Sequence, residues 1–222
     1  MNDEEFLELR QRMVAVIAAK TIFTCGQLGK AALSPRVMAA MGEIPRHRFV
    51  PLELQPDAYV DSPLPIGFDK TISQPFIVAV MTDLLDLQPA DTVLEIGTGL
   101  GYQTAILSRL ARQVYSMELI DELAQQARRR LARHGCTNVQ VGVRNGWHGW
   151  PEHAPFDKVL VAAAPDLIPP SLIDQMKPGG KMVIPAGLPD EQQLMLVEKN
   201  PAGHVTTRQI FAVRFSLLDD AD

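Results

Sequence analysis

The chain has 222 residues, of which 46% are hydrophobic and 21% are charged, and this composition suits one α/β domain with a buried core. Its 26 acidic residues outnumber its 21 lysines and arginines, and the net charge of −5 disfavours a protein that binds nucleic acids through their phosphates. No apolar run approaches the ~20 residues of a membrane span, and Cys25 and Cys136 form no metal-ligand spacing, so we expect a cytoplasmic protein with neither membrane attachment nor metal.

The first third of the chain predicts two helices and then a long irregular stretch. Apolar side chains recur at helical spacing over residues 4–20, and a second helix begins at Pro35 and is stopped by Pro45. Prolines and Gly67 punctuate residues 46–75. A structureless stretch of this length in a compact domain is usually functional, so we expect it to cover a ligand site.

From residue 76 onwards, helices and strands alternate. The expected helices are residues 76–85, 102–110, 121–134 and 170–176. The expected strands are residues 92–96, 113–118, 139–143, 156–161, 181–185, 194–199 and 204–215. This alternation predicts an α/β fold with a doubly wound, mostly parallel seven-stranded sheet, an antiparallel C-terminal hairpin and an N-terminal helical extension. We divide the single domain into helices and a covering loop (1–75), a ligand-binding core (76–190) and the hairpin (191–222).

The most informative segment is residues 93–101, Val-Leu-Glu-Ile-Gly-Thr-Gly-Leu-Gly. An apolar strand that contains Glu95 turns through Gly97, Gly99 and Gly101 into a helix beginning at Tyr102. Glycines permit positive φ and let the backbone approach a bulky ligand closely. The spacing differs from the Gly-x-Gly-x-x-Gly of dinucleotide-binding folds. It resembles the first motif of S-adenosylmethionine-dependent methyltransferases, and a purely structural turn is the alternative.

Glu118 ends the second expected strand, 21 residues after Gly97. In open α/β sheets, ligands bind beyond the carboxyl ends of the strands, where an acidic side chain can accept both ribose hydroxyls of an adenosine. Enzymes that use NAD share this device, so Glu118 supports adenosine binding rather than methyl transfer in particular. The alternative role is a favourable charge at the N-terminus of the helix that begins at Asp121.

Three further segments are not generic methyltransferase features. They are Pro45-Arg46-His47-Arg48-Phe49-Val50-Pro51, Ala58-Tyr59 with Asp61, and Thr71-Ile72-Ser73-Gln74-Pro75. Together with residues 94–103, 154–157, 172–185 and 213–215, they resemble the protein-L-isoaspartate (D-aspartate) O-methyltransferase family over nearly the whole chain.

The resemblance implies a Rossmann-like class I methyltransferase that uses S-adenosyl-L-methionine. It implies methylation of L-isoaspartyl carboxylates in damaged proteins, with D-aspartyl residues as a further candidate substrate, which starts repair through succinimide. Ser73 would be the active-site hydroxyl, and Ala58, Tyr59 and Val213 would contact the substrate. The partners would be isoaspartyl proteins and peptides, and the chain would be a monomer or weak dimer. The expected donor-binding residues are Thr71, Ile72, Gln74, Pro75, Glu95, Gly97, Thr98, Gly99, Gly101, Tyr102, Gln103, Glu118, Leu119, Asn145 and Gly146.

The expected reaction needs no general base, because a carboxyl with a reference pKa of about 3.9 is already ionised at pH 7. A Ser73 hydroxyl that donates to one carboxylate oxygen would orient the other toward the methyl group. The alternative is that Ser73 caps the helix that follows it. The local sequence leaves both roles open, and the resemblance favours catalysis.

One departure from the family pattern is Asn145, in Arg144-Asn145-Gly146, where the family usually has aspartate between two glycines. An amide oxygen can still accept a hydrogen bond from the adenine amino group, at a cost of about 1 kcal/mol in affinity. A plain Asn-Gly turn is the alternative. The departure leaves open a second hypothesis, in which the chain is an enzyme dedicated to one aspartyl residue of a partner peptide. A non-catalytic donor-binding adaptor is a third hypothesis, which the intact segment around Ser73 disfavours.

Two other groups of residues have plain structural interpretations. Arginines at positions 128–130 and Arg133 fall near the end of a helix, where a solvated basic face is favoured over an RNA site at this net charge. Trp147 and Trp150 could flank an adenine, and packing against the sheet edge is at least as well supported.

Overall fold

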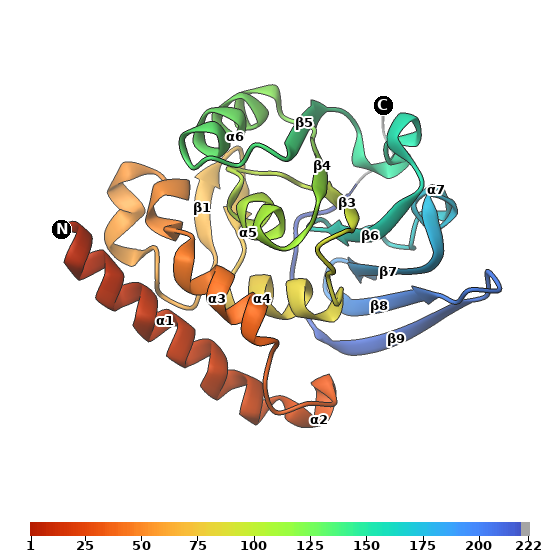
Figure 1. Cartoon of the computed structure of the whole chain (residues 1–222), viewed down its shortest axis with the longest axis horizontal. Coiled ribbons are helices and arrows are strands. Elements are labelled where there is room, and N and C mark those ends of the chain that lie inside the picture. Colours follow the sequence, from red (N-terminus) through yellow and green to blue (C-terminus); the bar gives the residue numbers. More distant parts are fainter. Residues whose placement is uncertain (219–222) are drawn as a thin grey trace.

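A seven-stranded sheet forms the centre of the structure, a computed structural model that describes residues 1–218 (Figure 1). The strand order is β5-β4-β3-β6-β7-β8-β9; the strands as far as β7 are parallel, and β8 and β9 are antiparallel to their neighbours. Their bounds are β3 Thr92–Ile96, β4 Gln113–Glu118, β5 Val139–Val143, β6 Phe156–Val161, β7 Met176–Ala186, β8 Gln193–Lys199 and β9 Val205–Ala212. The predicted mostly parallel sheet and its C-terminal hairpin are confirmed.

Two strand predictions differ from the structure by more than one residue at one end. β7 begins five residues before the predicted start at Lys181, because Met176 already pairs with Phe156 across an irregularity in the register. β9 ends at Ala212 rather than at Phe215, because Phe215 bonds to a side chain instead of a strand backbone: its N–H donates to Gln192 Oε1 at 2.6 Å, and Gln192 Nε2 donates to its carbonyl oxygen at 3.1 Å.

Helices of the first half cover one face of the sheet, and short elements cover the other. The helices are α1 Asp3–Phe23, α2 Cys25–Leu28, α3 Pro35–Glu43, α4 Pro75–Leu84, α5 Tyr102–Leu110 and α6 Asp121–Arg133. On the other face, α7 Pro170–Asp174, η3 Gly146–His148 and η4 Pro151–His153 surround a core with Trp150, Phe156 and Leu172. The predicted helix at 170–176 is therefore shorter than expected, since Met176 belongs to β7.

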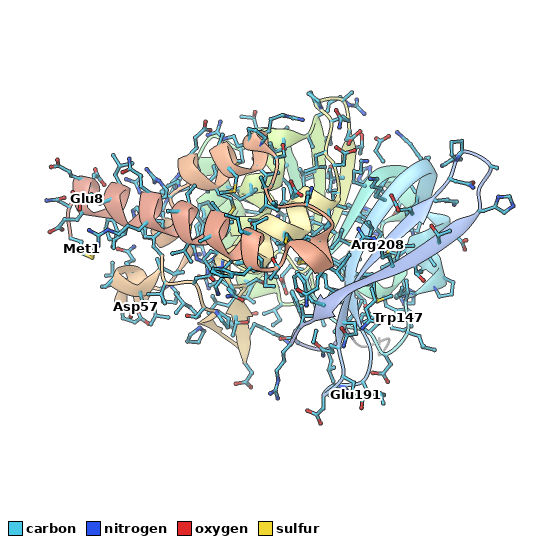
Figure 2. All side chains as sticks on the ribbon, turned by 90° about the horizontal axis from the view of Figure 1, so that it is seen from below. Met1, Glu8, Asp57, Trp147, Glu191 and Arg208 are labelled. Atoms are coloured by element: carbon cyan, nitrogen blue, oxygen red, sulfur yellow. The ribbon has the colours of Figure 1, made fainter. Side chains whose placement is uncertain are left out.

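Helix α1 lies along the outside of the molecule and packs on α3 and α4 (Figures 1 and 2). It starts with a reciprocal capping box, in which Asn2 and Glu5 each accept from the other's backbone N–H. Beyond the other end of α1, Arg208 of β9 reaches the Gln27 carbonyl oxygen at 3.5 Å. The N-terminal extension is thus attached to both the helical layer and the C-terminal hairpin.

The segment expected to be irregular, residues 46–75, contains regular elements. It holds two 3₁₀ helices, η1 Arg46–Phe49 and η2 Leu52–Asp57, and an antiparallel pair, β1 Leu64–Gly67 and β2 Lys70–Ile72. The turn of this pair has positive φ at Phe68 and Asp69. Pro65 of β1 is compatible with pairing because the two-stranded sheet leaves each strand with one open edge.

Two features are absent from residues 1–218. No helix there has the length and apolar character that crossing a bilayer requires. That part of the chain also has no group of three or more His, Cys, Asp and Glu side chains placed to hold a metal ion.

Candidate active site

The glycine turn joins the central strand β3 to α5, and two of its glycines are required by the backbone and its surroundings. Gly97 has φ +91°, and a Cβ there would lie 3.3 Å from the Cβ of Ala162. Gly101 has φ +93°, and its Cβ would lie 3.2 Å from Leu131 Cγ on α6. A side chain at either position would strain the backbone and push on a packed neighbour.

Glu118 ends β4 beside this turn, as the sequence predicted. One carboxylate oxygen accepts the Gly99 N–H at 2.7 Å, and the other accepts the Ile120 N–H at 3.1 Å. Its side chain is held at the carboxyl end of the sheet, and each oxygen keeps a lone pair that can accept a further hydrogen bond.

Glu95 of β3 forms hydrogen bonds with side chains of α5 and β4. It is fully buried, and its Oε2 accepts hydroxyl hydrogen bonds from Thr104 at 2.6 Å and Ser116 at 2.5 Å. Burial raises the pKa of Glu95 to about 7, although these hydroxyls lower it in part. Glu95 therefore ties β3 to α5 and β4.

Three cavities meet at the carboxyl end of the sheet. The glycine-turn cavity, of about 150 Å³, includes Gly97, Glu118 and Asn145 in its lining. The bridging cavity, of about 60 Å³, is lined mainly by apolar side chains and by Ser73. The β9-end cavity, of about 450 Å³, lies between Ser73 and the chain that follows β9. Thr71 and Ala162 line all three, so the cavities are contiguous.

Most of the predicted site residues line these cavities. The glycine-turn cavity includes Thr71, Gly97, Gly99, Glu118, Leu119, Asn145 and Gly146. The bridging cavity adds Ile72, Thr98, Tyr102 and Gln103. Gln74 and Val213 line the β9-end cavity. The linings of the three cavities do not include Pro75, Glu95, Gly101, Ala58 or Tyr59.

Ser73 lines both the bridging and the β9-end cavity, and it does not cap α4. The helix begins at Pro75 with Gln74 as its N-cap residue, and Phe76 N–H donates to Asp61 Oδ1 at 2.9 Å. Asp61 Oδ2 accepts from Gln74 Nε2 at 2.9 Å and pairs with Lys20 Nζ at 2.5 Å. The capping alternative is therefore wrong, because a carboxylate distant in sequence does the capping.

Arg46 connects the covering segment to Ser73, and the sequence analysis assigned it no role. Its side chain is fully buried; Nε donates to the Ala58 carbonyl oxygen at 2.7 Å and Nη2 to the Ser73 carbonyl oxygen at 2.8 Å. The guanidinium lies 4.9 Å from the centre of the Tyr102 ring. Burial lowers the pKa of Arg46 to about 10, so it stays charged at pH 7. Arg46 thus fixes the backbone at Ala58 and Ser73.

Several cavity-lining residues were missed by the sequence analysis. Ala162 follows β6 and lines all three site cavities, and Ile66 of β1 lines two of them. The position of Ala162 could have been found, because it follows a strand adjacent to β3, where ligands bind in open sheets. Ile66 could not, because the hairpin that places it was not predicted.

Asn145 lines the glycine-turn cavity and is also an N-cap. Its Oδ1 accepts the Trp147 N–H at 2.9 Å at the start of η3. Trp150 is buried, and its ring packs against Tyr115 and His153. Neither tryptophan belongs to the lining of the three cavities, which favours the packing interpretation.

The fold and the site define a Rossmann-like class I methyltransferase. A family model described as protein-L-isoaspartate (D-aspartate) O-methyltransferase matches residues 21–221, and the chain belongs to this family. The chain is 70% identical over its full length to protein-L-isoaspartate O-methyltransferase 1 of Polaromonas sp. (strain JS666 / ATCC BAA-500), of which it covers 94%. It is 53% identical to protein-L-isoaspartate O-methyltransferase 2 of Syntrophobacter fumaroxidans over 96% of this chain and 87% of that protein.

Two solved structures share the fold. One, named protein-L-isoaspartate O-methyltransferase, is 27% identical with a TM-score of 0.79; the match covers 94% of this chain and 65% of that one, so this chain spans about two-thirds of its length. The other, from Plasmodium falciparum, was solved in complex with S-adenosyl-L-homocysteine. It has a TM-score of 0.76 at 21% identity and matches over 100% of both chains, which shows the fold alone.

Proposed function

We infer that this chain transfers a methyl group from S-adenosyl-L-methionine to the carboxylate of L-isoaspartyl residues in damaged proteins, which starts their repair through succinimide. The observation that carries this proposal is the position of Ser73, where the bridging cavity meets the β9-end cavity. A donor that extends from the glycine-turn cavity into the bridging cavity, and a carboxylate in the β9-end cavity, would both lie beside its hydroxyl. The Polaromonas relative, which is 70% identical, is named protein-L-isoaspartate O-methyltransferase 1.

The residues of the glycine-turn cavity fit the donor. The turn has positive φ at Gly97 and Gly99, so its backbone can lie against a ligand without intervening side chains. The Glu118 carboxylate faces the cavity and can accept from ribose hydroxyls, and the Asn145 side chain lies farther along the same lining. When bound, the donor supplies a methyl group on a positively charged sulfur.

The bridging cavity suits a reaction in which opposite charges neutralise each other. Its lining includes five apolar side chains, and these limit the access of water: Ile66, Ile72, Val78, Met81 and Leu100. A water-poor site does not favour separated charges, so it favours their neutralisation.

Ser73 holds the acceptor. A carboxylate is ionised at pH 7, so this chain has no proton to remove. The Ser73 hydroxyl donates to one carboxylate oxygen and leaves the other directed toward the methyl group. Within residues 1–218 this hydroxyl makes no other hydrogen bond, and the loop that presents it is held by Arg46. Such alignment can lower a barrier by ~7–11 kcal/mol.

The substrate binds as an extended segment in the β9-end cavity. Val213, Arg214 and Phe215 line this cavity, so backbone contacts there give affinity with little selectivity for side chains. This favours general repair over modification of one dedicated peptide. The proposal includes a cytoplasmic location, supported by two free cysteines, and a monomer or weak dimer.

The test uses labelled donor with an isoaspartyl peptide and its twin that contains normal aspartate. Base-labile methyl groups should appear on the isoaspartyl peptide and not on its twin. Equal labelling of both would overturn the repair function and favour a general aspartyl methyltransferase. Donor binding without transfer to either peptide would instead support the adaptor hypothesis.

A further inference from the structure

A cavity of about 670 Å³ lies apart from the site, between residues of the η1–η2 segment and residues of α6. Its basic side chains come from two places in the chain: Arg48 from η1, and Arg129, Arg130, Arg133 and His134 from the end of α6. Its lining has no residue in common with the three site cavities. The helix dipole explains why cations lie at the end of α6. It does not explain why η1 contributes a further cation, Arg48, to the same cavity.

The charges of this arginine cavity are not balanced from within. No residue in its described lining is acidic, and Asp3 reaches Arg48 at 3.6 Å only from outside. The pKa of Arg130 is lowered by burial and by Arg129 and Arg133. The arginine side chains of this cavity therefore repel one another, although the protein as a whole has a net charge of −5.

A second cavity of similar size provides a comparison. It has about 600 Å³ between α3 and the C-terminal hairpin, and it also contains lysines and arginines. There, Lys30 pairs with Asp83, and Lys181 lies 3.4 Å from Glu198. Both lysines of this cavity thus have carboxylate partners from its own lining, whereas the described lining of the arginine cavity offers no carboxylate.

We propose that the arginine cavity binds a compact polyphosphate, either inorganic or the phosphate tail of a nucleotide. Guanidinium groups form bidentate hydrogen bonds with phosphate, and the volume of the cavity is in the range of small-ligand sites. Among residues 1–218, the lining has no Phe, Tyr or Trp on which bases could stack, which disfavours single-stranded RNA. The surrounding negative charge also opposes a long polyanion.

The experiment titrates inorganic tripolyphosphate into the full chain by calorimetry, in a phosphate-free buffer at physiological salt. Wild type should bind with a Kd below about 1 mM. The double variant Arg129→Gln, Arg133→Gln removes two exposed charges and should weaken binding about tenfold or more. The matched control is Arg128→Gln, because Arg128 is exposed on the same helix, donates to the Val141 carbonyl oxygen and is not in the lining. It should bind as wild type does.

Two other probes identify the source of the phosphate and the competing ligands. ATP that binds more tightly than tripolyphosphate, with the same loss in the double variant, would support a nucleotide as the ligand. Absence of tripolyphosphate binding, or equal losses in the double variant and Arg128→Gln, would overturn the proposal. So would binding of a short RNA or a polyglutamate peptide when tripolyphosphate does not bind. Thermal melting of each variant confirms its fold, and no outcome depends on methyl transfer.

Discussion

The glycine-turn region and the covering segment of residues 46–75 form opposite walls of one site, but they are held in place differently. In the glycine turn, the backbone fixes the geometry: Gly97, Gly99 and Gly101 adopt positive φ, and the Gly99 N–H donates to Glu118 on the next strand. In the covering segment, side chains do so, as Arg46 binds two carbonyl oxygens and Asp61 caps α4. The donor wall, which the glycine turn forms, is therefore set mainly by backbone conformation, and the acceptor wall, which the covering segment forms, is set by side-chain contacts.

The largest expected effect comes from Arg46→Gln in the covering segment. The change leaves the Ala58 and Ser73 carbonyl oxygens without charge-assisted donors, which should lower the free energy of unfolding by about 3 kcal/mol. Urea unfolding measures this loss. The control Arg48→Gln, at an exposed neighbour, should stay within about 0.5 kcal/mol of wild type. Equal losses in the two variants would contradict the role of Arg46.

Ser73→Ala tests the acceptor wall without disturbing its fold. We expect turnover at saturating donor to fall about 100-fold, as when one positioned hydrogen-bond donor is lost, with donor affinity nearly unchanged. Steady-state kinetics and donor titration measure the two effects. Ser108→Ala removes a hydroxyl from α5 that bonds only to the Ala105 carbonyl oxygen, and it should keep near-normal turnover. Unchanged turnover in Ser73→Ala would remove this residue from the mechanism.

Glu118→Gln tests the donor wall. The carboxylate accepts from two backbone N–H groups, whereas an amide has one oxygen and would oppose one N–H with its own NH₂. Donor affinity should weaken about tenfold, with little effect on turnover at saturation. Calorimetric titration of the donor measures this. Glu122→Gln, an exposed change on α6, is the control; a similar loss there would indicate a general effect of charge.

The smallest expected effect is on the pH dependence of stability, and it has opposite signs in the two regions. Burial, with Arg48 and Arg10, lowers the pKa of His47 to about 4, so unfolding takes up a proton and stability falls as pH drops from about 6.5 to 4. The pKa of Glu95 is raised to about 7, so its contribution is lost as pH rises from about 4.5 to 7.

Variants separate the two contributions. His47→Gln should reduce the loss of stability between pH 7 and pH 5, and Glu95→Gln should increase it. Unfolding free energies at the two pH values, each compared with wild type, measure these changes. The exposed change His204→Gln should keep the wild-type dependence. A shift of the same sign in both variants would contradict the assigned pKa directions.

The same contrast explains what could be predicted from the sequence. Strands β3 and β4, the turn between β3 and α5, and the position of Glu118 at the end of β4 were predicted correctly, because glycine spacing and apolar runs are local patterns. The hairpin of β1 and β2 and the role of Arg46 were missed. A buried arginine is recognised only when its carbonyl acceptors, 12 and 27 residues away, are seen folded around it. Ser73 was identified through family resemblance, and only the structure excluded its capping role.

The acceptors of Arg46 have a consequence for how this chain can diverge. Main-chain oxygens are present whatever side chain follows them, so substitutions at the residues that supply them need not break the two bonds. The arginine has no such freedom, since lysine lacks the planar fork that reaches both oxygens. The side chains of the covering segment, and the substrate preference with them, could therefore change while Arg46 holds the backbone at Ala58 and Ser73 in place.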